Sequence, residues 1–362
     1  MMQYKFLIYI SYSYAIPIGN PLEKELKNRG YEVQWFSDLE EGSNGLRNKT
    51  NALSSIKEVI HYKPDIVLAA TNDVPDFISG LKVQIFHGFF AQKRPGKNNK
   101  FAHFRIRGFF DLYCTQGPST TSRFKTLQKQ KKYFDVIETG WSKVDPLFPI
   151  ASKTVSTTPT IIIASTFTER LSLAYIDEVY NTIKALSTSG KYNFKMVLHP
   201  KIPLYLVEKW KQLDGPNFTF YDTTNLIPLF KKSDILFADT TSAIQEFLLQ
   251  KKPVVTFNHT LKHDYLIQIN QVESIETAFN KALSNPENLL QNIELYINEL
   301  HPYSDGKSSA RVVDATISFL QKDRSYLKQK PLNLIRKFKI RKRLRYFTLK
   351  SYRLPKKTIS NL

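Results

Sequence analysis

Two histidines each stand directly after an apolar run that is typical of a β-strand. His87 follows VQIF in the sequence, and His199 follows KMVL. The carboxyl ends of the strands form the ligand-binding edge of an open parallel sheet, so both imidazoles are candidates for chemistry. With an ordinary pKa of about 6.5, His87 could take a proton from a hydroxyl nucleophile, although a histidine that only closes a turn fits equally well. His199 could donate a hydrogen bond to a phosphate oxygen.

Hydroxyl side chains fill a turn between an apolar strand and a predicted helix at 242–250. This turn reads Asp239, Thr240, Thr241 and Ser242. The three hydroxyl groups and the free N–H groups of the first helical turn can bind phosphate oxygens. The same residue types favour the N-cap position, and capping is compatible with phosphate binding. The segment therefore predicts a phosphate-binding turn.

A second turn repeats this arrangement and adds a cation. Gly306 precedes Lys307, Ser308 and Ser309 at the start of a predicted helix at 308–322. A lysine beside free helical N–H groups favours an anion. Taken alone, the pattern is also that of an ordinary turn and helix cap.

The remaining motifs limit the chemistry. Gly140, Lys143 and Asp145 lie in a turn that would shape the floor of a ligand cleft or form a hinge. The sequence has no P-loop and no metal-ligand spacing such as HExxH. Cys114 is the only cysteine, which excludes an internal disulfide and a cysteine-rich zinc site. We expect no tightly bound metal or other cofactor, and a loosely held divalent cation is compatible with this expectation.

Short apolar runs alternate with helical segments along most of the chain, which favours parallel sheets with right-handed crossovers. A stretch rich in Pro, Ser and Thr at 146–160 is typical of a linker. We predict an α/β protein with two Rossmann-like domains facing a central cleft, followed by a basic amphipathic tail. The first domain is predicted to span residues 1–150, the second 158–323 and the tail 324–362. We also predict a helix at 20–29 with Asn20 as its N-cap, and a long helical region over 272–300.

The charge is unevenly distributed. Residues 324–362 contain fourteen Lys and Arg and no acidic residue, and residues 93–132 contain eleven Lys and Arg and one acid, Asp111. Such segments favour a polyanionic partner or an anionic membrane surface, with a merely solvated basic surface as the alternative. No apolar stretch reaches the roughly 18 residues of a membrane-spanning helix, so we expect any membrane contact to be peripheral.

Taken in order, these segments resemble the CDP-glycerol glycerophosphotransferase family of teichoic acid and capsule polymer synthesis, whose members have the two-domain GT-B architecture. The family's Gln-x-Trp-His-Gly motif looks matched by Gln84, Phe86, His87 and Gly88, with Phe86 in place of tryptophan. The other matching positions are Gly140, Lys143 and Asp145, then His199-Pro200, then Asp239 to Ser242 with Glu246-Phe247, and finally Asp305-Gly306-Lys307.

This resemblance implies transfer of an alditol phosphate, glycerol phosphate first, from a CDP-alcohol to a hydroxyl of a membrane-associated or polymeric glycan, with release of CMP. His87 would be the general base, and His199 would lie beside the donor pyrophosphate. The other donor-binding residues would be Asp239, Thr240, Thr241, Ser242, Lys307, Ser308 and Ser309, and the acceptor-side residues Gly88, Lys93, Arg94, Lys143 and Asp145. The enzyme would be cytoplasmic and peripheral on the inner face of the membrane, held to anionic lipid by its tail, with no nucleic-acid partner expected.

Three other functions fit parts of the pattern. A GT-B glycosyltransferase would use a nucleotide sugar, and a UDP-sugar 2-epimerase would share the phosphate-binding helix SAIQEF. Against the epimerase, the sequence predicts no acidic pair beside the His87 strand that could remove a proton from a sugar carbon. A membrane-bound scaffold with vestigial histidines is the alternative that is not an enzyme.

Overall fold

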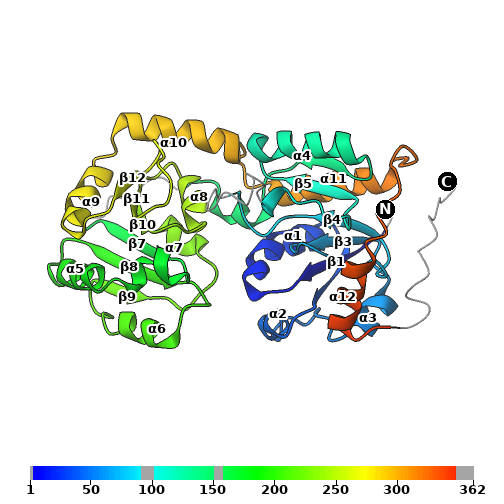
Figure 1. Ribbon diagram of the computed structural model, residues 1–362, viewed down its shortest axis with the longest axis horizontal. Coiled ribbons are helices and arrows are strands. Elements are labelled where there is room, and N and C mark those ends of the chain that lie inside the picture. Colours follow the sequence, from blue (N-terminus) through cyan, green and yellow to red (C-terminus); the bar gives the residue numbers. More distant parts are fainter. Residues whose placement is uncertain (1–2, 91–101, 151–157, 348–362) are drawn as a thin grey trace. The chain divides into compact units, whose positions relative to one another are not determined.

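The computed structural model describes residues 3–90, 102–150 and 158–347, and it divides into two compact units (Figure 1). The first unit contains the described residues up to His87, those from 102 to Asp145, and those from Asp305 onward. The second contains 88–90 and Pro146–Ser304. Lys93 and Arg94, part of the predicted linker and the end of the tail lie outside the described residues.

The first unit is built on a six-stranded sheet in which all neighbouring strands are parallel, in the order β2-β1-β3-β4-β5-β6. The sequence order reverses direction between β1 and β3. Its strands are β1 (Lys5–Ile10), β2 (Glu32–Ser37), β3 (Ile66–Ala69), β4 (Leu81–Gln84), β5 (Leu112–Thr115) and β6 (Asp135–Glu138). Its helices are α1 (Ile16–Asn28), α2 (Glu40–Gly45), α3 (Ile56–Tyr62), α4 (Pro118–Lys131), α11 (Ser308–Gln321) and α12 (Leu334–Leu344).

The second unit has its own six-stranded parallel sheet, in the order β12-β11-β10-β7-β8-β9. Read from β9, this is the Rossmann order 3-2-1-4-5-6, with the reversal between β7 and β10. Its strands are β7 (Thr160–Ser165), β8 (Asn193–Leu198), β9 (Phe218–Phe220), β10 (Ile235–Ala238), β11 (Val254–Phe257) and β12 (Ile267–Ile269). Its helices are α5 (Asp177–Thr188), α6 (Leu204–Lys211), α7 (Ile227–Lys231), α8 (Ala243–Leu248), α9 (Ile275–Leu283) and α10 (Glu287–Leu300).

The burial of the strands explains why both sheets are parallel and central. In the first unit β3, β4 and β5 are buried along their whole length, and in the second unit β10 and β11 are as well. Strands that are covered on both faces read as continuous apolar runs rather than alternating ones. This is the pattern that predicted the α/β class, and the structure confirms that class.

Two predicted ranges are corrected. Residues 305–323 were predicted to belong to the second domain, but α11 packs against α1 and β5 of the first unit. Residues 324–347 were predicted to be part of a separate tail, but α12 belongs to the first unit as well, and Ile340 and Arg341 are each only 2% exposed. The chain therefore returns to the first unit after the second is complete, a crossing that local sequence does not reveal.

Some element boundaries also differ from the sequence predictions. The predicted helix at 20–29 begins earlier, at Ile16, so Asn20 is not its N-cap and Pro21 lies inside it. The region 272–300 forms two helices, because Asn285 takes a left-handed conformation (φ 50°) before Pro286. The short elements α2 and β12 were not predicted, since neither carries a long periodic pattern. In the described part of the chain, no helix has the length and apolar character needed to span a membrane.

Candidate functional site

The second unit places a polar cluster at the point where its strand order reverses. Asp239 follows β10, and its carboxylate is completely buried. It accepts hydrogen bonds from Ser165 Oγ at 2.5 Å, from the Thr166 N–H at 3.1 Å and from the Leu173 N–H at 3.1 Å. Asp239 therefore ties the loop after β7 to the end of β10, which makes it a positioning residue for the turn that follows.

That turn is the predicted phosphate-binding segment. Thr240 is 2% exposed, and its Oγ1 is buried without a hydrogen-bond partner among the described residues. Thr241 Oγ1 accepts a long hydrogen bond from the Ala243 N–H, at 3.4 Å. Ser242 is the N-cap of α8, yet its side chain makes no capping hydrogen bond. A buried hydroxyl without a partner is costly, so the Thr240 hydroxyl is a candidate for binding a ligand at this edge.

His199 follows β8, the neighbour of β7. Its Nδ1 accepts a hydrogen bond from the Lys201 N–H at 3.1 Å, so a neutral ring carries its proton on Nε2. The ring lies 4.5 Å from the ring of Phe167, between centroids, and Lys201 Nζ lies 5.8 Å from the centre of the same Phe167 ring. The local backbone therefore fixes the tautomer of the neutral His199 ring, with the proton on Nε2.

In the first unit, His87 borders a cavity of about 160 Å³ at the carboxyl ends of β1 and β3, where that sheet's order reverses. Most of its lining is polar or aromatic. Tyr12 and Tyr14 stack on each other at 5.3 Å, and the Tyr14 ring lies 6.5 Å from the His87 ring. The other lining residues are Ser11, Ala15, Leu39, Ala70, Thr71, Asn72, Asp73 and Arg343.

The environment of His87 favours its neutral form. Part of the residue is open to solvent. The protein atoms around its ring, together with the charge of Arg107, lower the pKa of His87 below its usual 6.5. The preceding residue, Phe86, has a left-handed backbone (φ 56°), and its carbonyl accepts a hydrogen bond from Trp141 Nε1 at 3.3 Å. A bulky residue in that conformation is strained, and it is found where the surrounding structure fixes a functional turn.

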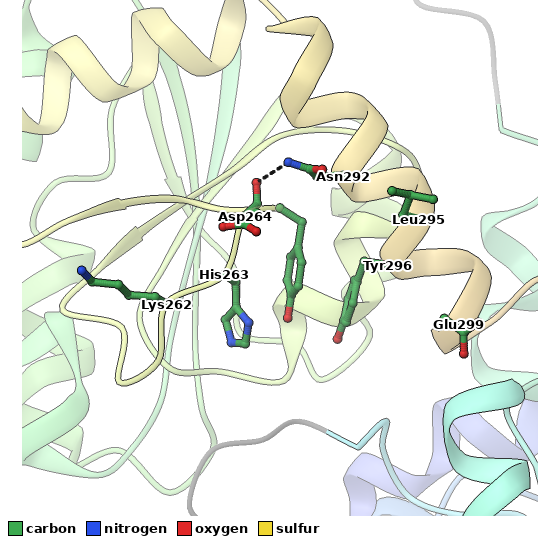
Figure 2. A pocket seen from close by; sticks show the side chains of 8 residues that line it. Lys262, His263, Asp264, Asn292, Leu295, Tyr296 and Glu299 are labelled. Carbon is green, nitrogen blue, oxygen red and sulfur yellow. Dashed lines mark hydrogen bonds between the residues drawn. The ribbon is translucent and has the colours of Figure 1, made fainter.

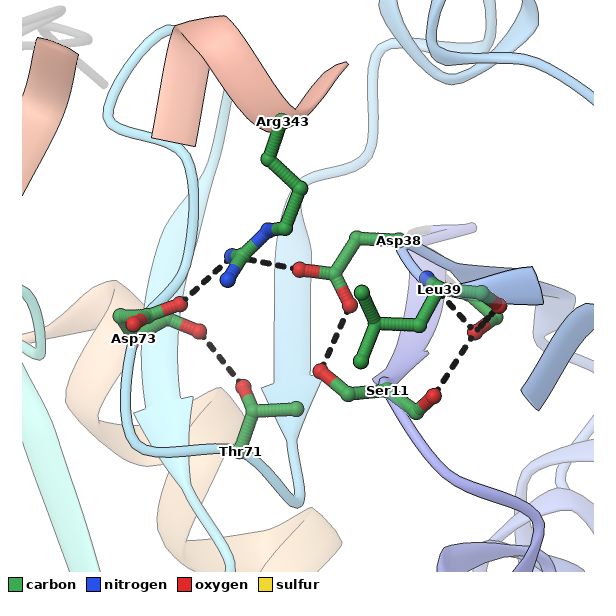
Figure 3. A network of polar contacts seen from close by, with 7 residues as sticks. Ser11, Asp38, Leu39, Thr71, Asp73 and Arg343 are labelled. Atoms are coloured by element: carbon green, nitrogen blue, oxygen red, sulfur yellow. Dashed lines mark hydrogen bonds and ion pairs between the residues drawn. The ribbon is translucent and has the colours of Figure 1, made fainter. Parts of the chain in front are cut away.

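Arg343 reaches this cavity from α12, far away in the sequence. Its Nη2 lies 2.5 Å from Asp38 Oδ2 and 2.8 Å from Asp73 Oδ1 (Figure 3). Ser11 Oγ donates to Asp38 Oδ1 at 2.6 Å. Burial raises the pKa of Asp38, against the lowering effect of Ser11 and Arg343. Folding thus brings together two acids from separate segments, Asp38 and Asp73, and Arg343 pairs with both of them.

The second predicted anion site already has an internal anion. Asp145 accepts hydrogen bonds from the Ser308 N–H at 2.8 Å, the Ser309 N–H at 2.7 Å and Ser309 Oγ at 2.6 Å. Burial raises the pKa of Asp145, and these hydrogen bonds oppose the rise. The anion at the start of α11 is thus the carboxylate of Asp145, from the same unit. This geometry does not support the prediction that Ser308 and Ser309 bind the donor substrate.

The other predicted residues take up different positions. Lys307 is exposed, and its N–H donates to Asp305 Oδ1 at 3.0 Å. Lys143 lies with its Nζ 5.4 Å from the centre of the Trp141 ring. Gly88 begins the short segment of the second unit that follows His87. Among the described residues, no cluster of three or more His, Cys, Asp or Glu side chains has metal-binding geometry.

A wider cavity of about 400 Å³ lies on the second unit, between α10 and the loop before β12 (Figure 2). The rings of Tyr265 and Tyr296 stack at 3.8 Å, and His263 stacks on Tyr265 at 4.7 Å. The Asn292 amide donates to the Asp264 carbonyl at 3.2 Å. The sequence did not predict this cavity, because aromatic residues scattered over two elements form no local motif.

No family model and no curated relative matches the sequence. Among solved structures, the chain is similar to the wall teichoic acid polymerase TagF, with a TM-score of 0.64 and 11% identity over 88% of this chain and 89% of that one. It is also similar to the UDP-GlcNAc 2-epimerase from Neisseria meningitidis bound to UDP-GlcNAc, with a TM-score of 0.57 and 14% identity over 87% and 100%. MnaA from S. aureus, in a structure with UDP, has a TM-score of 0.57 and 15% identity over 91% and 99%. The chain thus has the two Rossmann-like units of the GT-B fold.

Proposed function

We propose that this protein transfers an alditol phosphate, most simply glycerol phosphate, from a CDP-alcohol to a hydroxyl group of a glycan or polymer acceptor and releases CMP. The observation that carries the proposal is a pair of polar groups at one edge of the second unit's sheet. There His199 has its Nδ1 occupied and its Nε2 as the donor, and the buried hydroxyl of Thr240 has no partner among the described residues. Thr240 follows β10, where the strand order reverses, and His199 follows β8, the next strand after β7, at the usual ligand edge of this fold.

The chemistry requires a base, a bound diphosphate and little else. His87, neutral because of its lowered pKa, would take the proton of the acceptor hydroxyl. The acceptor oxygen then forms a bond to the phosphorus that carries the alcohol, and the bond from that phosphorus to the bridging oxygen breaks. CMP leaves with the bridging oxygen, and the imidazolium returns its proton to water. Positioning and neutralisation of charge supply most of the acceleration in such reactions.

The acceptor side of the proposal rests on the first unit. The hydroxyl, amide and carboxylate groups around the His87 cavity, with the stacked pair Tyr12 and Tyr14, suit a polyhydroxylated group. The name of TagF and its structures soaked with CDP-glycerol support a donor of this class. A lipid-linked or polymeric acceptor would place the enzyme on the cytoplasmic face of the membrane, and the basic sequence at 93–132 suits an acceptor that carries phosphate.

A ³¹P NMR time course with purified protein tests the proposal. We expect CDP-glycerol or CDP-ribitol to be converted to CMP and a new phosphodiester when a glycan or teichoic acid acceptor is present, and His87→Ala to abolish this conversion while the protein stays folded. Unchanged turnover by His87→Ala would contradict its role as base. Inactivity of the wild type with every CDP-alcohol and acceptor tested would contradict the proposed reaction.

A second candidate function has one specific observation in its favour. Asp73 lines the cavity that His87 borders, so a carboxylate and an imidazole are available together for proton transfer at a sugar carbon. Two structural neighbours are a UDP-GlcNAc 2-epimerase and a protein with bound UDP. Incubation with UDP-GlcNAc in D₂O distinguishes the candidates. Epimerisation at C2 would introduce solvent deuterium there, whereas the proposed transferase leaves UDP-GlcNAc unlabelled.

A further inference from the structure

Helix α12 has two chemically different sides. Ile340 and Arg341 face the first unit and are buried, whereas Leu334 is 68% exposed, Ile335 74% and Phe338 56%. Residues three or four positions apart are neighbours on a helix surface, so Phe338 lies beside both Leu334 and Ile335, and the three form a continuous apolar ridge. Lys339 and Lys342 are exposed on the same side. An exposed helix normally turns its apolar side inward, and α12 therefore leaves a second apolar side uncovered.

The inward side of α12 is fixed by charge as well as by packing. Arg341 Nη1 lies 2.7 Å from Asp76 Oδ1, Lys337 Nζ lies 3.3 Å from Asp76 Oδ2, and Arg343 pairs with Asp38 and Asp73. The Arg341 guanidinium also lies 4.9 Å from the centre of the Phe77 ring. These cations are committed to acids of their own unit. These ion pairs hold α12 against the first unit and leave its outer side available to a partner.

The outer side continues into neighbouring residues of the same character. Phe347 is 47% exposed, and its ring lies 5.9 Å from that of Phe338. Leu332, just before the helix, is 69% exposed. The sequence from 324 to 362 holds no acidic residue, so nothing on this segment repels an anionic surface. Large apolar side chains surrounded by lysine and arginine match the boundary between anionic head groups and acyl chains.

We propose that the ridge of Leu334, Ile335 and Phe338, with Lys339 and Lys342, is the surface by which this protein docks on an anionic lipid bilayer. The apolar side chains enter the head-group boundary, and the lysines lie among the lipid phosphates. Arg343 of the same helix lines the His87 cavity, so the docked helix is also part of the candidate site. The inference rests on the membrane location given under the proposed function, but not on the reaction.

Vesicle co-sedimentation of the full chain tests this surface without any measurement of turnover. The probes are vesicles of phosphatidylcholine alone and vesicles with about 30 mol% phosphatidylglycerol. We expect the wild type to bind the anionic vesicles far more tightly. The triple variant Leu334→Ser, Ile335→Ser, Phe338→Ser is expected to need at least about tenfold more lipid for half-binding.

The matched control is the double variant Leu204→Ser, Leu295→Ser, which removes two leucines of the second unit that are each 68% exposed. It is expected to bind like the wild type, and circular dichroism would verify the fold of both variants. Wild-type binding by the triple variant, or an equal loss in the control, would overturn the proposal. Tighter binding of the wild type to duplex DNA than to anionic vesicles, at the same salt concentration, would assign the surface to nucleic acid and overturn it too.

Discussion

The two histidines have distinct local environments, and these fit distinct roles. His199 has its Nδ1 bonded to a main-chain N–H, which fixes Nε2 as the donor of the neutral ring. The protein atoms around the His87 ring, and to a smaller extent the positive Arg107, lower its pKa and keep it neutral and able to accept a proton. Their placement at strand ends could be predicted from the sequence, because an apolar run ends at each. The tautomer and the pKa could not, since they depend on neighbours that only folding supplies.

The lowered pKa of His87 predicts a pH profile. A general base works only when it is deprotonated, so a lowered pKa keeps activity as the pH falls through 6.5 and loses it only below that value. Arg107→Gln removes a charge that lowers this pKa, so we expect the acidic limb of kcat/KM to move to higher pH. A limb that stays in place in Arg107→Gln would contradict the assignment of that limb to His87.

A substitution at Thr240 gives a second test, because it should affect the stability of the protein and the binding of the donor in different ways. Thr240→Val keeps the shape of the side chain and removes a buried hydroxyl that has no partner among the described residues. We expect the melting temperature to stay level or rise, because the unpaired group is gone, and the KM for the donor to rise by about tenfold, as for one lost hydrogen bond to a charged group. If the donor KM is unchanged, the hydroxyl does not bind the diphosphate.

At the level of helices and strands, partners that are distant in sequence explain what local patterns missed. The serines at the start of α11 and the apolar run after them predicted the helix correctly. The anion at its N-terminus is Asp145, which lies 163 residues earlier than Ser308. Helix periodicity is local, whereas the choice between an internal carboxylate and a ligand phosphate is decided by tertiary structure. The strands were predicted far better than the helix caps, because a buried strand appears in the sequence as an apolar run.

Removal of this cap should lower stability. Asp145→Ala leaves the Ser308 and Ser309 N–H groups without their acceptor in a buried place, which we expect to cost about 2 kcal/mol of unfolding free energy. Asp145→Asn, which keeps one acceptor oxygen, should cost less. The control is Asp314→Ala on the same helix, whose side chain is 66% exposed and whose ion pair with Arg29 should contribute less than about 1 kcal/mol. Urea denaturation measures all three, and equal midpoints for Asp145→Ala and Asp314→Ala would contradict the cap.

A pair of substitutions tests whether α12 belongs to the first unit. Ile340 is 2% exposed and Ile335 is 74% exposed on the same helix. Ile340→Ala should cost about 2 to 4 kcal/mol through lost burial and a cavity, whereas Ile335→Ala should change the unfolding free energy by less than about 0.5 kcal/mol. Equal, small effects at both positions would mean that the helix is not docked.

Over the whole molecule, the order of apolar runs predicted the fold class and the composition gave the charge, but neither predicted how the chain divides into its two units. Two series of apolar runs gave two Rossmann-like units, yet the return of residues 305–347 to the first unit carries no local mark. The tail was predicted from its fourteen cations, and the structure commits Lys337, Arg341 and Arg343 to acids inside the unit. The net charge indicates the kind of partner that a protein attracts, but it does not indicate which charged side chains already form ion pairs within the protein.

The formal net charge of +20 predicts how salt affects acceptor use. Attraction of a polyanionic acceptor is screened once the Debye length falls to about 10 Å or less, near 0.1 M salt. We expect the KM for a teichoic acid polymer to rise several-fold between about 0.02 and 0.3 M NaCl, and the KM for a neutral oligosaccharide acceptor to change little. The same response for both acceptors would mean that the positive charge has no part in acceptor binding.

The structure of the full chain with CDP-glycerol bound, in a His87→Asn variant that halts turnover, tests the central claim most directly. We expect the diphosphate to lie on the second unit, within hydrogen-bond distance of His199 Nε2 and Thr240 Oγ1. A diphosphate bound elsewhere on the chain, with both of these atoms free of it, would contradict the account.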